Sequence, residues 1–519
     1  MADQKPSVFR LSPLDMLMPR MHVPKLLYFS SSSEPGVILA TLRTALALTI
    51  EAIPIISGSI ALSEHENDQQ GSLSVQRPHS TAEQILSSND LREIYDFERL
   101  RASHFPSNAI PLAEYAPKSF GGSADSMPVM MAQANFLRGG LLLFFAIHHC
   151  VMDEMGFFNV MKVWAACARG DTGLDLISPQ WFDREPLMQG FGTGRLDHHP
   201  EYTLSLEGAA TKATEDPSVF YPIKSSEVES AVFFLSDESL GRLKAAATKP
   251  HGSRTGEQDV EENTWISTND ALIALFWCSI TSARIGESTG DENIFPRFGM
   301  AVNGRDRLRP PISPDYTGNV VLIAKTVTSA GNLLPSNPDS LVKAALLVRR
   351  SINDVDDAYI RDTIQMVRSV KDLGQLAPRR RPAVEHSLGC SSWARQPYYS
   401  LDWGNLIGGR CERVRWRSLR TDGLFMIFPR LPQAEDAEGM HDPNRRQKRA
   451  SGNLLWRFWY AVWGLCRRWW WLSVGMPNRK PSNTHGNGGV EVLLGLKTDH
   501  MRRLKEDDTF TQFAEWRCN

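Results

Sequence analysis

The chain has 519 residues, which is more than one simple hydrophobic core usually organises, so two large domains are expected. Apolar residues make up 42% and charged residues 22%, an ordinary globular composition that excludes wholesale disorder. The formal net charge of −2 gives no global electrostatic reason to expect nucleic acid as a partner.

The cysteines and the N-terminus indicate the compartment. Seven cysteines are scattered along the chain without a CxxC pair, which disfavours both a structural zinc site and a secreted disulfide scaffold. The first fifteen residues lack the basic and apolar regions of a secretory signal. The chain contains no run of about 18 uncharged apolar residues, so a membrane span is not expected. We therefore expect a cytosolic protein without a metal site or a membrane span.

The first elements follow one another closely. Residues 12–15 read as a short polar turn, and residues 36–53 have apolar positions at helical spacing. Pro54 should end this helix, and residues 55–62 are expected to form a strand. Residues 128–136 are predicted to form another strand.

The most informative stretch begins with a turn signal at residues 138–140. Residues 141–147 form a continuously apolar run, which is typical of a strand buried on both faces. His148 and His149 follow at once, and an apolar helical pattern covers residues 157–164. Two imidazoles thus stand where a buried strand ends, a common place for a site in α/β proteins.

The second half begins after a charged, Gly- and Pro-rich crossover over residues 170–262. A strand is expected from Ser230, and residues 267–285 form a helical pattern whose polar start fits N-capping. Residues 300–303 should form a strand, after which Arg305 and Arg307 follow.

His149 and Asp153 stand four residues apart, and no other histidine has aspartate at that spacing. An acyl transfer needs a base that is neutral near pH 7 and reaches the proton of the acceptor, and imidazole meets that requirement. The context of a buried strand, a second imidazole and an apolar helix makes His149 the candidate general base.

Ordinary structural roles compete with this interpretation. A histidine at the end of a buried strand is often a hydrogen-bonded core residue, and His148 fits that role best because it should point away from His149. Asp153 precedes a helix, so it could be the N-cap or form a salt bridge that shapes the loop. Cys150 reads as a small buried residue. Adjacent histidines point apart, which disfavours zinc.

The segment HHCVMDEMG (148–156) resembles the HHxxxDG signature of the BAHD acyltransferases and, more distantly, of peptide-synthetase condensation domains. Glu154 stands where that signature has glycine. Further segments resemble the fungal branch that includes trichothecene O-acetyltransferases, and they occur in family order: LSPLD (11–15), STNDALIALFW (267–277), AVNGRDRLRPPISPDYTGNVV (301–321), SSWARQPYYSLDWG (391–404) and VEVLLGL (490–496).

The resemblance implies an α/β fold of two similar, chloramphenicol-acetyltransferase-like domains, over residues 1–215 and 216–519. Each would be a mixed sheet flanked by helices, with a channel between them. It implies a monomer with no bound cofactor, an acyl-CoA co-substrate, and a small-molecule alcohol or amine as acceptor. His149 would match the catalytic base, and Asp153 a carboxylate that pairs with an arginine, for which Arg305 is the candidate.

Asp402 and Gly404 match the family's DFGWG motif, which is structural and expected near the channel mouth. Trp403 replaces the phenylalanine, and Asn405 stands where a second tryptophan helps some relatives to polarise the thioester. An amide could replace that donor.

Three functions follow from these residues. The first is O-acylation, with acetyl as the expected acyl group, in fungal secondary metabolism. The second is amide formation by a condensation-type N-acyltransferase, although no carrier-protein segment is found. The third is a catalytically impaired binding protein, which Glu154 and Asn405 would favour.

Residues 434–487 interrupt an expected hairpin between residues 425–428 and 490–494. The segment is acidic, then basic, then rich in tryptophan. It could be an interfacial amphipathic helix, a solvent-exposed loop with its own aromatic cluster, or non-native sequence such as a retained intron.

Overall fold

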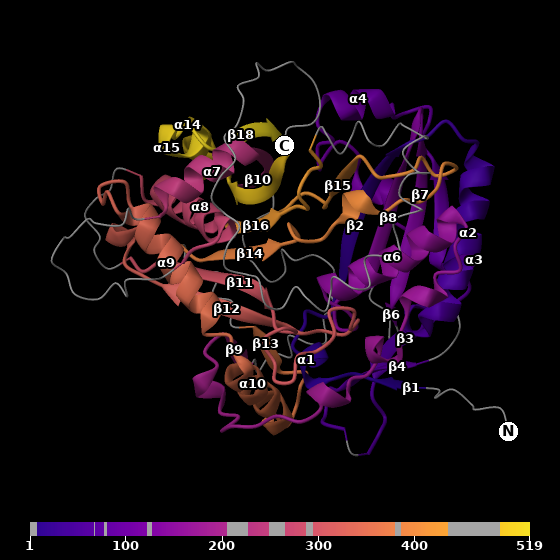
Figure 1. Cartoon of the computed structure of the whole chain (residues 1–519), viewed down its shortest axis with the longest axis horizontal. Coiled ribbons are helices and arrows are strands. Elements are labelled where there is room, and N and C mark those ends of the chain that lie inside the picture. Colours follow the sequence, from indigo (N-terminus) through magenta and orange to yellow (C-terminus); the bar gives the residue numbers. More distant parts are fainter. Residues whose placement is uncertain are drawn as a thin grey trace, which may run out of the picture.

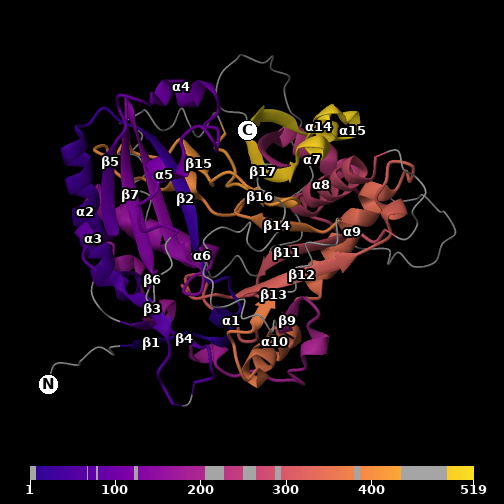
Figure 2. The same cartoon turned by 180° about the vertical axis from the view of Figure 1, so that it is seen from behind.

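The computed structural model describes residues 8–66, 68–76, 80–121, 127–204, 227–248, 265–286, 294–378, 386–433 and 488–519. Two main sheets with their helices lie side by side (Figure 1), and the view from behind shows the same division (Figure 2). The expected α/β fold of mixed sheets flanked by helices is confirmed. The predicted domain boundary after residue 215 and the Trp-rich segment 434–487 lie outside the described residues.

The first main sheet has five strands, mostly antiparallel, in the order β15 (Arg413–Arg415), β2 (His22–Ser30), β8 (Gly140–His148), β7 (Met130–Leu137) and β5 (Leu86–Asp90). Strand β8 is buried along its whole length, as its apolar run predicts. Its odd-numbered residues face the helices α2 (Pro35–Ala52) and α6 (Glu154–Arg169). Its even-numbered residues pack beneath α4 (Phe97–Ala102) and α5 (Leu112–Tyr115). Because side chains alternate along a strand, residues at the end of β8 point to one face of the sheet or the other according to whether their number is odd or even.

Helix α2 is long and apolar enough to cross a membrane by length and composition alone. One face, however, carries Ile38, Leu42 and Leu46, which are fully buried in the core. The indole of Trp164 on α6 also donates a hydrogen bond to the carbonyl of Leu42. Packing against the first sheet therefore accounts for the apolar face of this helix.

The second main sheet has seven strands, in the order β12 (Val321–Val327), β11 (Arg297–Asn303), β14 (Leu388–Ser392), β16 (Leu424–Ile427), β17 (Gly489–Lys497), β10 (Val228–Ser236) and β18 (Glu515–Cys518). Its helices are α7 (Asp237–Ala246), α8 (Thr268–Ile285), α9 (Ser340–Asn353), α14 (Thr498–Glu506) and α15 (Asp508–Thr511). Ser267 caps α8 in a capping box with Asp270, as its polar start predicts. Strands β16 and β17 pair antiparallel, so the expected pairing around residues 434–487 is confirmed.

Smaller sheets complete the fold. Strands β1 (Val8–Arg10), β4 (Leu73–Gln76), β3 (Ser59–Leu62) and β6 (Met127–Pro128) form a four-stranded sheet, and β9 (Tyr202–Leu204) pairs with β13 (Leu376–Pro378). Two predictions are wrong in detail. The expected strand over 55–62 begins only at Ser59, because Pro54 starts a 3-10 turn that runs to Ser57. The strand over 128–136 splits into β6 and β7, which belong to different sheets.

Candidate active site

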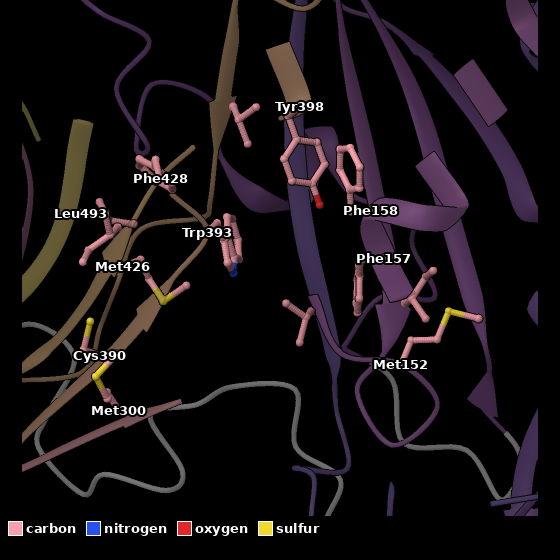
Figure 3. Packing of buried hydrophobic residues seen from close by; sticks show 14 of the residues in the cluster. Met152, Phe157, Phe158, Met300, Cys390, Trp393, Tyr398, Met426, Phe428 and Leu493 are labelled. Carbon is pink, nitrogen blue, oxygen red and sulfur yellow. The ribbon is translucent and has the colours of Figure 1, made fainter. Parts of the chain in front are cut away.

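A large cavity lies between the two main sheets, with a volume of about 2170 Å³. His149, Phe157 and Phe158 line it from the first half, and strands β11, β14 and β16 contribute Met300, Cys390 and Met426 from the second. Figure 3 shows Phe157 and Phe158 of the first half facing Met300, Cys390 and Met426 of the second half. Because single-ligand pockets span roughly 300–1,000 Å³, this cavity has room for two substrates.

His149 directly follows strand β8, and its backbone is fixed from two sides. Its N–H donates to the carbonyl of Met21 at 2.8 Å, and its own carbonyl accepts from the side-chain amide of Asn319 at 2.9 Å. The ring is half-buried in the cavity wall. Its Nδ1 is enclosed by protein, which leaves Nε2 as the nitrogen that a ligand can reach.

Burial lowers the pKa of His149 from its ordinary value, because the charged form of the ring is poorly solvated there. The nearby backbone of His149 and of Met152, together with the negative charge of Asp153, opposes this drop in the pKa. Lys25 deepens it. The ring is therefore neutral at pH 7, which is the protonation state that a general base needs.

Asp153 is the N-cap of α6 and accepts from the N–H groups of Met155 and Gly156 at 3.1 and 3.2 Å. It also forms the expected pair with Arg305, with distances of 2.7 and 2.9 Å between the guanidinium nitrogens and the two carboxylate oxygens. Only 1% of Asp153 and 2% of Arg305 is exposed. Both structural roles considered for Asp153 are thus confirmed, and the pair ties α6 to the end of β11.

Asp15 is a second buried carboxylate that sequence reasoning did not single out as a site residue. It lies in the one-turn helix α1 (Pro13–Met16), where a polar turn was expected. Its Oδ1 accepts from the backbone and the side-chain amide of Asn319 at 2.9 and 2.7 Å, and its Oδ2 accepts from Arg184 at 3.0 Å. Because Asn319 also holds the carbonyl of His149, Asp15 supports the base indirectly. The sequence signals were the segment LSPLD (11–15), which resembles the family, and the capping spacing of Ser12 and Asp15.

The neighbours of the base have the ordinary roles considered for them. His148 lies on the opposite side of the sheet, fully buried, with its ring centroid 5.1 Å from that of His22. Burial lowers its pKa well below the ordinary value. Cys150 is also fully buried, and burial raises the pKa of its thiol to about 12.

The Asp402–Gly404 motif does not lie where it was expected. Trp403 packs edge-on against Phe29 and Trp164, and the carbonyl of Asp402 accepts from Arg169, the last residue of α6. Helix α6 has 16 residues, or about 24 Å, so the motif lies a full helix length from Asp153. Asn405 is exposed and does not line the cavity. The structural role is confirmed, but the expected place near the channel mouth is wrong, and Asn405 is no donor to a thioester there.

Basic residues dominate the charged lining of the cavity. Thirteen of its residues are lysine or arginine and seven are aspartate or glutamate, whereas the whole chain has a net charge of −2. The cavity therefore offers a favourable environment for a polyanion such as a substrate that carries phosphate groups. Within the described ranges, no three histidine, cysteine, aspartate or glutamate side chains are grouped as a metal ion would need.

The chain is similar in sequence to known proteins. The model of the Transferase family matches residues 2–439. The acyltransferase BOA11 of Botryotinia fuckeliana is 29% identical over 78% of this chain and 87% of its own length. The O-acetyltransferase ptmV of Penicillium ochrochloron is 27% identical, with coverages of 81% and 90%. Eremophilane O-acetyltransferase prx11 of Penicillium rubens is 25% identical over 98% of both chains.

Among solved structures, TRI101 of F. sporotrichioides, crystallised with coenzyme A and T-2, superposes with a TM-score of 0.71. It is 20% identical, and the match covers 98% of this chain and 99% of that one. Vinorine synthase superposes with a TM-score of 0.54 at 14% identity, covering 99% and 95%. These likenesses support the fold. With the family model spanning most of its length, the chain belongs to the Transferase family and is an acyltransferase of the BAHD type.

Proposed function

We propose that this protein transfers an acyl group, with acetyl as the first candidate, from coenzyme A to a hydroxyl group of a small secondary metabolite, with His149 as the general base. The observation that carries the proposal is the position of the His149 ring, half-buried in the wall of a cavity that both halves of the chain line. The names of the curated relatives support O-acetylation rather than amide formation.

The mechanism uses one imidazole twice. Nε2 of His149 removes the proton of the acceptor hydroxyl, and the oxygen attacks the thioester carbonyl to form a tetrahedral oxyanion. The resulting imidazolium then protonates the departing thiolate, so protons balance over the cycle. A base of this kind contributes about 10²–10⁴ in rate, and holding both substrates together supplies about 7–11 kcal/mol more.

Asp153 has a supporting part in this scheme. Both of its carboxylate oxygens face Arg305 and the start of α6, so the carboxylate holds the loop that carries His149 and does not itself receive the proton. The basic lining of the cavity supports acyl-CoA as the donor, since its phosphate groups need cations.

The test measures free coenzyme A released from acetyl-CoA in the presence of a panel of hydroxylated acceptors. His149→Ala should lose about 10²–10⁴ of kcat. His198→Ala is the matched control, because His198 is exposed and does not line the cavity. Equal rates for wild type and His149→Ala would reject the mechanism.

We propose a monomer in the cytosol, without a membrane span. Light scattering of the purified protein tests the first part, and fractionation of the producing cells tests the second.

A further inference from the structure

Lys25 is a fully buried lysine in the middle of strand β2, among apolar neighbours. Its Nζ lies 2.7 Å from Oε2 of Glu154, and also 4.0 Å from the ring centroid of Phe157 and 4.2 Å from that of Trp393. Figure 3 shows these rings near Tyr398, whose ring is 6.0 Å from the same Nζ. Lysine is almost never buried so completely unless it is paired.

Glu154 is the partner, and it directly follows Asp153. It is the first residue of α6 and stands where the HHxxxDG signature has glycine. Its Oε1 accepts a hydrogen bond from the hydroxyl of Tyr398 at 2.8 Å. The carboxylate keeps 19% exposure and lines the same cavity as His149. The pair thus links β2, α6 and the segment after β14.

The pair lies on the His149 side of the sheet. Strands β2 and β8 run antiparallel with Lys25 opposite Phe145, and Phe145 belongs to the set that faces α6. The positive charge of Lys25 lowers the pKa of His149, and the negative charge of Asp153 raises it.

Asp15 and Arg184, which contact the loop of the base through Asn319 and through the carbonyl of Val151, compensate one another. Arg305 compensates Asp153, and Glu154 compensates Lys25. His148 and His22 face one another on the opposite side of the sheet, and Tyr398 carries no charge at neutral pH because burial raises its pKa well above the ordinary value. The charges in each of these pairs are compensated, and Asp153 and Lys25 are the members that act on the pKa of His149.

We propose that Lys25 and Glu154 are positioning residues that act through His149: each charge cancels the effect of the other on the imidazole, and together they hold the Trp393–Tyr398 segment against α6. The inference rests on the proposed role of His149 as the base. It gives a role to Glu154, which stands where the signature has glycine. Lys25 is the cation that compensates the charge of this glutamate.

The test compares pH profiles of kcat/KM for wild type, Lys25→Met, Glu154→Gln and the double variant. Lys25→Met leaves a negative charge near the base, so the acid limb of the profile should move to higher pH. Glu154→Gln leaves a positive charge, so the limb should move to lower pH. The double variant removes both charges, and its limb should return to the wild-type position.

Tyr398→Phe is the matched control, because it removes a hydrogen bond to Glu154 without changing any charge. A purely structural role would reduce rates in all variants without moving the limb in opposite directions. The inference is overturned if both single variants leave the limb in place or move it in the same direction. It is also overturned if the limb of the double variant differs from that of wild type, or if Tyr398→Phe moves the limb. Should one single variant not fold, the direction in which the limb of the other single variant moves still decides.

His149→Ala in the same assay separates the two proposals. If it keeps the wild-type rate, the proposed base is wrong. If it is inactive while the limb fails to respond to Lys25→Met and Glu154→Gln, only the inference about the pair fails.

Discussion

Replacing Asp153 with alanine should destabilise the fold far more than an ordinary surface change. The substitution removes the N-cap of α6, which costs about 1 kcal/mol. It also leaves the guanidinium of Arg305 buried without its carboxylate, which costs about 3–5 kcal/mol. The sum of about 4–6 kcal/mol is a large share of the typical 5–15 kcal/mol of a folded protein.

The measurement is urea unfolding at 25 °C, followed by tryptophan fluorescence. Asp153→Asn separates the two contributions, because asparagine still caps a helix but carries no charge. Asp315→Ala is the matched control: Asp315 also pairs with a cation on α6, Lys162, at 3.0 Å, but 44% of its side chain is exposed. Such a pair contributes about 0–1 kcal/mol. A loss of unfolding free energy for Asp153→Ala no larger than that of the control would refute the reasoning.

Three further predictions follow from buried groups. Because burial lowers the pKa of His149, the acid limb of kcat/KM should lie below the ordinary histidine value of about 6.5, and a limb above pH 7 would contradict the assignment. Burial opposes ionisation of Glu491, but Arg415 and Arg413 hold its pKa at about 2. The ionised carboxylate therefore stabilises the folded protein fully above the ordinary pKa of 4.5, and this stabilisation is lost as the pH falls toward 2. Glu491→Gln should therefore unfold at lower temperature at pH 7 and show a flatter loss of Tm between pH 4.5 and 2; an unchanged pH profile of Tm would speak against the pair. Cys150 should resist iodoacetamide at pH 8 in the native protein, since burial raises its pKa to about 12, and peptide mapping that finds it alkylated before unfolding would disprove this.

Several elements could be predicted from local patterns alone. The run over residues 141–147, the helix before Pro54 and the capped helix after Ser267 all appear in the structure close to their expected bounds. Hydrophobic periodicity and capping act over a few residues, so the chain reveals them without knowledge of the fold. The candidate base could be predicted for the same reason, because His149 stands where β8 ends.

Contacts between distant segments could be predicted only from the family resemblance. Arg305 was the expected partner of Asp153 on that basis, and the structure joins them across 152 positions. The same resemblance placed the Asp402–Gly404 motif near the channel mouth, whereas the structure places it at the far end of α6. Motif order along the chain does not specify which end of a helix a later loop contacts.

By itself, the sequence determined most of the elements, the position of the imidazole after a buried strand and the absence of a large net charge. The tertiary structure alone decided that Asp15 and Asn319, 304 positions apart, hold the backbone of His149, and that Lys25 meets Glu154 beside it. The reason is physical: side-chain alternation and helical spacing are local, but the partner of a buried charge depends on the order and register in which the strands pair.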